Sequence, residues 1–380
     1  MTDQPETLDP QRQQQAKEYA RIGRRIFVAE LAIGAAYVLF WVFSGLSPWL
    51  RNQIYPFTES VWLAVPLFAL GFGLPYTVLT APLSYYSGFV LPHRYGQSTQ
   101  SLADWLKDQA KGMALSGVLG LFILLVVYGL LTTAPGSWWL WAALVMLVFS
   151  VLLSNLAPVL IFPLFYKYKP LDDDELVVRL TRLAERAGAQ VRGVYAFDMS
   201  SKTVAANAAL MGLGSTRRIV LGDTLLTNFS HDEIETVLAH ELGHHVHRDL
   251  PLGILVQSGL TLVGFWLADA VMRWGVSAFG YNGLADPATL PLLLVALALF
   301  GLVTMPLGNA WSRWREVLAD RYALETTGKT QAFINAMTRL ANQNLADAEP
   351  PAWVEFLLHS HPSISKRVAL AQKFPAPKLG

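Results

Sequence analysis

Residues 230–272 read SHDEIETVLAHELGHHVHRDLPLGILVQSGLTLVGFWLADAVM, and this stretch decides the fold class. Its first part is polar and begins with a capping box, in which Ser230 is followed three residues later by Glu233. Its second part, residues 250–272, is apolar and reaches the roughly 20 residues that a helix needs to cross a bilayer. The sequence therefore predicts a polar helix, ending near His247, that leads directly into a membrane-spanning helix.

Five further stretches are long and apolar enough to span a bilayer. They are residues 26–46, 61–84, 112–131, 138–165, where Pro158 predicts a bend, and 290–311. The whole chain is 53% hydrophobic and only 15% charged, whereas a soluble domain is about 25% charged. Six such runs do not fit the buried helices of a soluble protein, so we expect a mainly α, polytopic membrane protein.

Basic residues favour one orientation of these spans. They cluster before the first span, between the second and third, and after the fourth, at Arg12, Lys17, Arg21, Arg24, Arg25, Arg94, Lys107, Lys111, Lys167 and Lys169. The opposite side has only Arg51 and Arg273 near its spans. Because cytoplasmic loops carry the excess of Lys and Arg, both termini and residues 166–249 are expected to face the cytoplasm.

The spans divide the chain into four parts. Residues 1–165 form an N-terminal membrane domain of four spans, residues 166–249 a small soluble α+β insert, residues 250–312 two more spans, and residues 313–380 a helical C-terminal part. Within the insert we expect a helix from the capping residues 172–174 to Gly188 and a strand over 191–197. A hairpin is expected from residues 205–213 and 217–221. The first dozen residues are expected to have no fixed structure.

The sequence His240-Glu241-Leu242-Gly243-His244 carries the chemistry. Positions i and i+4 share one face of a helix, so His240 and His244 can occupy two corners of a zinc tetrahedron, and Glu241 lies where it can deprotonate a metal-activated water. The chain has no cysteine, so any metal must be held by His, Asp or Glu. The net charge of +1 argues against a nucleic-acid partner. The alternative to a metal site at His240 and His244 is a His-rich amphipathic helix whose side chains contact only solvent.

A catalytic zinc needs a third protein ligand. A third His six residues after His244 is excluded, because that position is Leu250. Glu316 is the best acidic candidate, just beyond the sixth span. Asp320 follows one helical turn later, where a carboxylate can accept the free N–H of a ligand histidine. Taken alone, these acids fit an ordinary solvated helix face better than a metal site, and the need of the histidine motif for an acidic third ligand reverses this preference.

Two other places could contribute to a site. His361 and Arg367 could stabilise an oxyanion or bind a substrate carboxylate, although a capping Ser363 and a surface arginine explain the same residues. Residues 207–213, which begin with Asn207 and Ala208, could form an exposed edge strand that pairs with an extended substrate. Spacing does not decide either point.

These motifs, in this order, resemble the type I CAAX prenyl proteases, which are integral-membrane zinc proteases. The resemblance covers about residues 82–370 and includes Asn207-Ala208, the 218–226 segment RIVLGDTLL, the His240–His244 motif, Glu316 to Asp320, and His361-Pro362-Ser363 with Arg367. It implies Glu316 as the third zinc ligand and Asp320 as its supporting carboxylate. It also implies that His361 and Arg367 lie near the substrate, and a barrel of about six or seven membrane helices around a chamber.

Together these observations predict a membrane zinc metalloendopeptidase with one Zn²⁺ per chain. Its expected substrate is a peptide or membrane protein, lipid-modified or not, and its expected location is a bacterial inner membrane with the site on the cytoplasmic side. The alternatives are a quality-control protease of the HtpX type, a site-two-type intramembrane protease, and a transporter or non-catalytic membrane chaperone with a structural metal. A site-two-type enzyme would carry its motif inside a span, and a structural metal would have four protein ligands.

Overall fold

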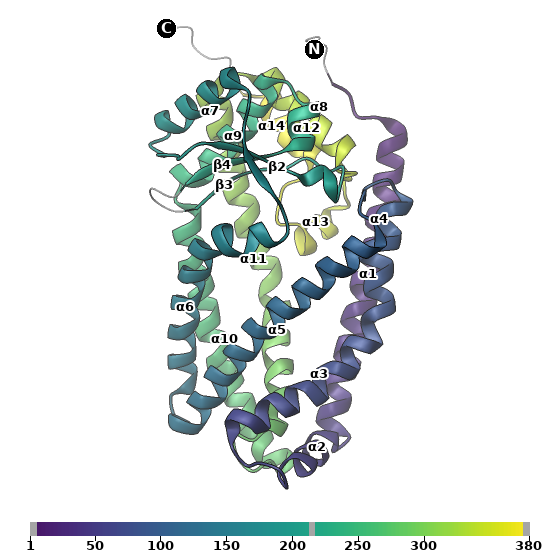
Figure 1. The fold of residues 1–380 in the computed structure, drawn as a ribbon, viewed down its shortest axis with the longest axis vertical. Coiled ribbons are helices and arrows are strands. Elements are labelled where there is room, and N and C mark those ends of the chain that lie inside the picture. The colour runs from purple at the N-terminus through teal and green to yellow at the C-terminus, as the bar shows by residue number, and fades with distance from the viewer. Residues whose placement is uncertain (1–5, 213–216, 375–380) are drawn as a thin grey trace.

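The computed structural model describes residues 6–212 and 217–374, and it is mainly helical with one small sheet (Figure 1). The helices are α1 (Pro10–Phe43), α2 (Leu46–Ile54), α3 (Val61–Tyr85), α4 (Leu91–Arg94), α5 (Leu102–Thr133), α6 (Trp138–Leu156), α7 (Asp174–Arg186), α8 (Asp223–Asn228), α9 (His231–Val246), α10 (Asp249–Phe279), α11 (Leu290–Thr327), α12 (Thr330–Gln343), α13 (Ala352–Leu358) and α14 (Ile364–Gln372). The strands are β1 (Tyr168–Pro170), β2 (Val194–Phe197), β3 (Ala208–Met211) and β4 (Arg218–Gly222).

The described residues contain six helical segments long and apolar enough to cross a membrane, which confirms the six predicted spans. In spatial order, α1, α3, α5, α6, α10 and α11 each contact the next, and α11 contacts α1, so the helices close a ring. No more than 22% of the most apolar window of any span is buried. The helices therefore form a barrel around a chamber instead of a solid bundle, in which each helix would bury one face.

One end of the barrel is closed by a compact apolar core. It includes the fully buried side chains of Phe68, Tyr128 and Trp138. A buried ion pair between Arg51 of α2 and Asp286 ties this core together. The opposite end carries the rest of the protein, which we call the head and define as residues 166–249 and 313–374.

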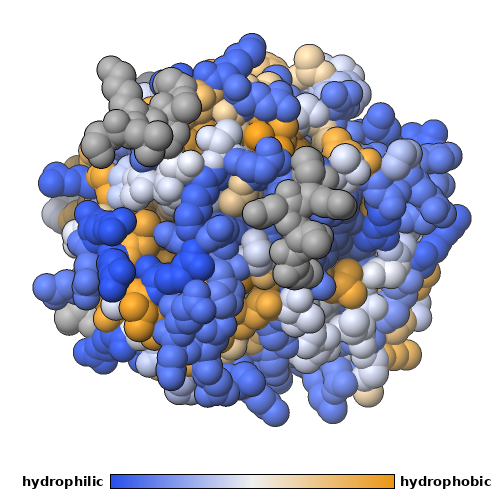
Figure 2. Space-filling view, turned by 90° about the horizontal axis from the view of Figure 1, so that it is seen from above, coloured by the Kyte–Doolittle hydropathy of each residue, from blue (hydrophilic) through white to orange (hydrophobic). Residues whose placement is uncertain are grey.

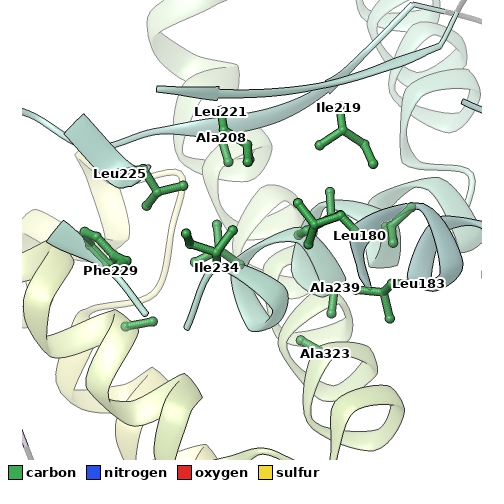
Figure 3. Close-up of a cluster of buried hydrophobic side chains, with 14 of the residues drawn as sticks. Leu180, Leu183, Ala208, Ile219, Leu221, Leu225, Phe229, Ile234, Ala239 and Ala323 are labelled. Carbon is green, nitrogen blue, oxygen red and sulfur yellow. The ribbon is translucent and has the colours of Figure 1, made fainter. Parts of the chain in front are cut away.

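The head contains the sheet, with strand order β1-β2-β4-β3. Strands β2 and β4 are parallel, β1 and β3 are antiparallel to their neighbours, and β3 lies at an edge. The predicted hairpin is confirmed as β3 and β4, while its turn lies outside the described residues. Figure 3 shows Ile219 and Leu221 pointing from the sheet toward the helices that carry Leu180 and Ile234, and these side chains are fully buried. This core holds α7 and α9 against the sheet.

The predicted start of the motif helix is confirmed in detail. Ser230 accepts a hydrogen bond from the Glu233 backbone N–H, and the Glu233 carboxylate accepts one from the Ser230 backbone N–H. This reciprocal capping satisfies donors that a helix start leaves unpaired. Asp173 caps α7 with a single hydrogen bond, which its Oδ1 accepts from the Leu176 backbone N–H. Both caps fix where the head helices begin.

One feature differs from the sequence prediction. Residues 10–12 are helical and not without structure: α1 begins at Pro10 with Asp9 as its N-cap, and it is held against α12 by hydrogen bonds to Asn342. Helix α11 runs without a break through residues 312 and 313, so one helix joins the sixth span to the C-terminal region, which was expected to be helical. At Pro158 the fourth span changes to a π-helical turn, Ala157–Ile161, where the bend was predicted.

The start of α1 and the end of α14 both lie at the head end of the molecule (Figure 1), as an even number of spans requires. Seen from this end, most of the surface is hydrophilic (Figure 2). The wall of the barrel, in contrast, exposes large apolar side chains such as Leu79, Val118 and Val303. The apolar surface of the barrel therefore suits a lipid bilayer, and the hydrophilic surface of the head suits an aqueous environment.

Candidate metal centre

The site forms where α9 crosses α11. A Cβ atom added to Gly243 would lie 2.8 Å from Ala319 Cα and 3.1 Å from Ala319 O, so the two helix backbones touch at this point. Only glycine permits this approach. The crossing brings the two histidines of α9 to the single buried glutamate of α11.

The three predicted ligands meet at this crossing. His240 Nε2 lies 3.2 Å from His244 Nε2 and 3.3 Å from Glu316 Oε2, and His244 Nε2 lies 3.4 Å from Glu316 Oε1. Among the described residues, these three form the one group of His, Cys, Asp or Glu side chains placed to share a metal ion. No fourth protein ligand is in this group, which differs from a closed structural site.

These separations fit zinc. Two ligands at about 2.0–2.1 Å from a tetrahedral zinc are about 3.3 Å apart. Glu316 Oε2 is buried and has no hydrogen-bond partner among the described residues, and an unpaired buried carboxylate oxygen is costly. A cation bound between the three side chains would satisfy this oxygen and separate the two imidazole nitrogens, so the donor set fits the metal.

A buried carboxylate supports His240 from behind. His240 Nδ1 lies 2.9 Å from Asp320 Oδ1, and Arg367 donates to both Asp320 oxygens, with Nε 2.8 Å from Oδ2. Burial alone would lower the pKa of His240, but the carboxylates of Asp320 and Glu316 raise it to about 9. This negative surrounding favours positive charge at the site, which a bound cation would supply. With the ring neutral, Nδ1 donates to Asp320 and the Nε2 lone pair faces the metal position.

His244 has a matching support that the sequence analysis missed. Its Nδ1 lies 2.7 Å from Asp249 Oδ2, and Asp249 Oδ1 accepts a hydrogen bond of 2.7 Å from Arg315 Nε of α11. In a continuous helix, a residue five positions after His244 would lie on a different face. Arg248 adopts a left-handed backbone, with φ of 57°, which ends α9 and turns Asp249 back toward His244.

Glu241 lies between two cavities. One, of about 720 Å³, is also lined by Asn207, Ala208, His361 and Arg367. The other, of about 610 Å³, lies on the side of Leu210 and His244. Burial raises the pKa of Glu241, and its carboxylate makes no hydrogen bond or ion pair with any described residue. It is therefore available to a water or substrate beside the three ligands.

Comparison with known proteins agrees with this geometry. Residues 170–374 match peptidase family M48, and residues 3–167 match the CAAX prenyl protease N-terminal family, described as five membrane helices. The chain belongs to peptidase family M48. Four of its six candidate spans lie within the second match.

Relatives share nearly the whole chain. The uncharacterized metalloprotease YhfN of Bacillus subtilis is 33% identical over 94% of this chain and 85% of its own length. CAAX prenyl protease 1 of Saccharomyces cerevisiae is 30% identical over 77% of this chain and 68% of its own length. The crystal structure of Ste24p from S. mikatae superposes with a TM-score of 0.86 and 25% identity, covering 97% of this chain and 92% of that one. The M48 chain is thus a membrane metalloprotease of the CAAX prenyl protease type, as the resemblance predicted.

The remaining predicted residues of this M48 protease also border the site. His361 follows α13, and its Nε2 lies 3.3 Å from Glu316 Oε1. Arg313 of α11 holds this loop, because its Nη1 donates to the carbonyls of Glu355 and His359. Helix α9 is not one of the candidate spans in the described chain, whereas the site-two-type alternative requires its motif inside a span.

Proposed function

We propose that this membrane metalloprotease is a zinc endopeptidase in which His240, His244 and Glu316 hold the metal and Glu241 is the general base. The observation that carries the proposal is the set of ligand separations of 3.2, 3.3 and 3.4 Å. The Glu241 carboxylate beside them, which has no hydrogen-bond or ion-pair partner among the described residues, supplies the base. When bound, zinc would polarise the substrate carbonyl and lower the pKa of a water molecule to about 7.

We assign a separate role in catalysis or in orienting the ligands to each of the surrounding side chains. Glu241 takes a proton from the attacking water and delivers it to the leaving amine. His361 lies on the open side of Glu316 and is placed to donate to the oxyanion. Arg367 is buried and bound to Asp320, so we assign it to holding Asp320, which in turn orients His240. The same logic assigns Asp249 and Arg315 to orienting His244.

Strand β3 gives the substrate a place to pair. The backbone N–H of Gly222 bonds to the carbonyl of Asn207. Because pairing alternates along an antiparallel ladder, the backbone groups of Ala208 and Leu210 point away from β4. Asn207 Oδ1 accepts a hydrogen bond from the Ala208 N–H, which marks the position that a substrate carbonyl would take. An extended peptide on this edge would pass Glu241 and place its two ends in the two cavities.

The substrate we propose is a peptide segment of a membrane-associated protein, lipid-modified or not. The site lies at the junction of head and barrel, because Asp249 opens a candidate span and Glu316 lies within another. The placement of Lys and Arg supports a cytoplasmic head, and the relative from Bacillus subtilis supports a bacterial source for the chain.

Glu241→Gln tests the proposal. The variant should retain zinc, because the three ligands remain, while cleavage of an internally quenched peptide should fall by about 10²–10⁴-fold. Glu325→Gln, at an exposed position near the C-terminal end of α11, is the matched control and should keep full activity. Undiminished cleavage by Glu241→Gln would overturn the assignment of the base.

A further inference from the structure

The side chain of Asn344 binds the backbone just before the edge strand β3. Its Oδ1 accepts a hydrogen bond of 2.8 Å from the Ala206 N–H, and its Nδ2 donates one of 3.1 Å to the Ala206 carbonyl. The amide thus pairs with Ala206 as a neighbouring strand would. Ala206 lies one residue before Asn207, whose carbonyl begins the ladder to β4. Both Ala206 and Asn344 line the larger cavity beside Glu241.

The backbone that presents Asn344 is strained. Asn344 is the C-cap of α12, and Leu345 follows with φ of 54°, a left-handed conformation that is usually taken by glycine after a helix. The Ala346 N–H bonds back to the Ala341 carbonyl and closes the helix end. Leu345 is 3% exposed and lines the same cavity. Strain of this kind persists where the surrounding structure over-determines it, and it gathers at functional sites.

Neighbouring contacts hold the same segment. Gln343 Nε2 donates to the Val204 carbonyl at 2.7 Å, and Gln97 Nε2 donates to the Gln343 carbonyl at 3.2 Å. The Val204 N–H bonds to the Gln97 carbonyl at 3.3 Å. Residues 204–206 are therefore fixed from outside the sheet by α12 and by the loop before α5. Asn344 is the last of these contacts before the edge that borders Glu241.

We propose that Asn344 is a positioning residue for the substrate, and this inference rests on the proposed pairing of the peptide with β3. By fixing Ala206, Asn344 sets the distance between the outward groups of Ala208 and the Glu241 carboxylate. Without it, the β3 edge would shift relative to the metal ligands while those ligands stayed in place. Among the described residues, the Asn344 side chain forms hydrogen bonds with Ala206 and none with His240, His244 or Glu316, so its loss is expected to act through substrate binding.

The test uses Asn344→Leu and Asn344→Asp. Leucine keeps the approximate size and removes both hydrogen bonds. Aspartate keeps the shape of asparagine and the acceptor for the Ala206 N–H, but it places a carboxylate oxygen against the Ala206 carbonyl. This variant therefore tests the same contact if the leucine variant fails to fold. Asn342→Leu is the matched control, because Asn342 is on the same helix and its amide bonds to the backbone of Thr7 and Asp9 instead of the strand.

The substrates are an internally quenched octapeptide, chosen from a library for cleavage by the wild type, and its analogues with one non-scissile amide at a time replaced by an ester. Esters remove single N–H donors, so wild-type KM should rise for the bonds that pair with β3. For both Asn344 variants, we expect KM for the parent peptide to rise about 5- to 30-fold, with kcat changed less than 3-fold and zinc content unchanged. In these variants, replacing an amide by an ester should raise KM much less than in the wild type, because the β3 edge no longer lies in register with the bound peptide.

The outcomes separate the two proposals. If no ester raises the wild-type KM, pairing with β3 is wrong and the inference fails with it. If esters affect the wild type but both Asn344 variants keep its KM and its ester pattern, pairing stands and the role of Asn344 is wrong. An equal KM increase in Asn342→Leu would also overturn it, because a general effect of α12 would then explain the result.

Discussion

Gly243→Ala should weaken metal binding without touching a ligand. The new Cβ would lie 2.8 Å from Ala319 Cα, 3.1 Å from its carbonyl oxygen and 3.2 Å from its Cβ. Carbon atoms prefer separations of about 3.5–4.0 Å. The obstacle is backbone, so no side chain can rotate away and α9 must move from α11 by about 0.7 Å or more.

Two opposing terms decide the size of the effect. Alanine improves a helix over glycine by about 0.5–1 kcal/mol, while overpacking costs about 1–3 kcal/mol. Moving α9 outward would also widen the 3.4 Å separation between His244 Nε2 and Glu316 Oε1 toward about 4 Å, beyond the roughly 3.3 Å that tetrahedral zinc requires. If binding must restore the crossing, a strain of about 1–3 kcal/mol corresponds to a zinc affinity about 5- to 150-fold lower.

The assay is competition for zinc against a chromophoric chelator, with cleavage measured at saturating metal. Gly117→Ala is the control, because a Cβ at that helical position meets no atom within 4 Å. Adding Ala319→Gly to the variant removes only the 3.2 Å contact, so recovery should be partial. A Gly243→Ala protein with wild-type zinc affinity would refute the claim that this crossing sets the ligand spacing.

Three further outcomes are expected. Asp249→Asn should lower zinc affinity about 10- to 100-fold, because His244 Nδ1 loses a charged acceptor. The exposed Asp172→Asn should not lower it, and equal affinities in the two variants would contradict the role of Asp249. Chelation should abolish cleavage and lower the Tm, and added zinc should restore both; a metal-free protein that cleaves at the full rate would exclude a metal mechanism. Burial raises the pKa of Glu235, but Lys329 and Arg179 outweigh it and hold that pKa below 4.5. The ion pair between Glu235 and Lys329 therefore stabilises the fold above about pH 4.5. This contribution is lost as the pH falls through the lower, folded-state pKa of Glu235. Lys329→Ala should reduce the Tm at pH 7 and have a smaller effect near pH 3, and a constant difference would argue against the ion pair.

The features of this protein that depend on local pattern could be predicted from the amino-acid sequence. Apolar runs of sufficient length define spans whatever their neighbours are, and all six were found. The capping box at Ser230 and the i, i+4 spacing of His240 and His244 are likewise local, because one helix contains every atom involved. Glu316 and Asp320 could be named as candidates because a metal with two histidines needs an acid, and because the ordered motifs resemble a known family.

The site contacts that depend on how separate helices pack could be found only in the tertiary structure. The three proposed ligands come together where Gly243 lets α9 touch α11 at Ala319, a contact between residues 76 positions apart that no spacing rule describes. Asp249 was missed because a single left-handed residue, Arg248, reverses the face on which it lies. From the sequence, Arg367 was a candidate to stabilise an oxyanion or bind a substrate carboxylate, or else a surface arginine; in the structure it is buried against Asp320. Contacts between side chains of different helices depend on how those helices pack. The periodicity of a single segment does not predict this packing.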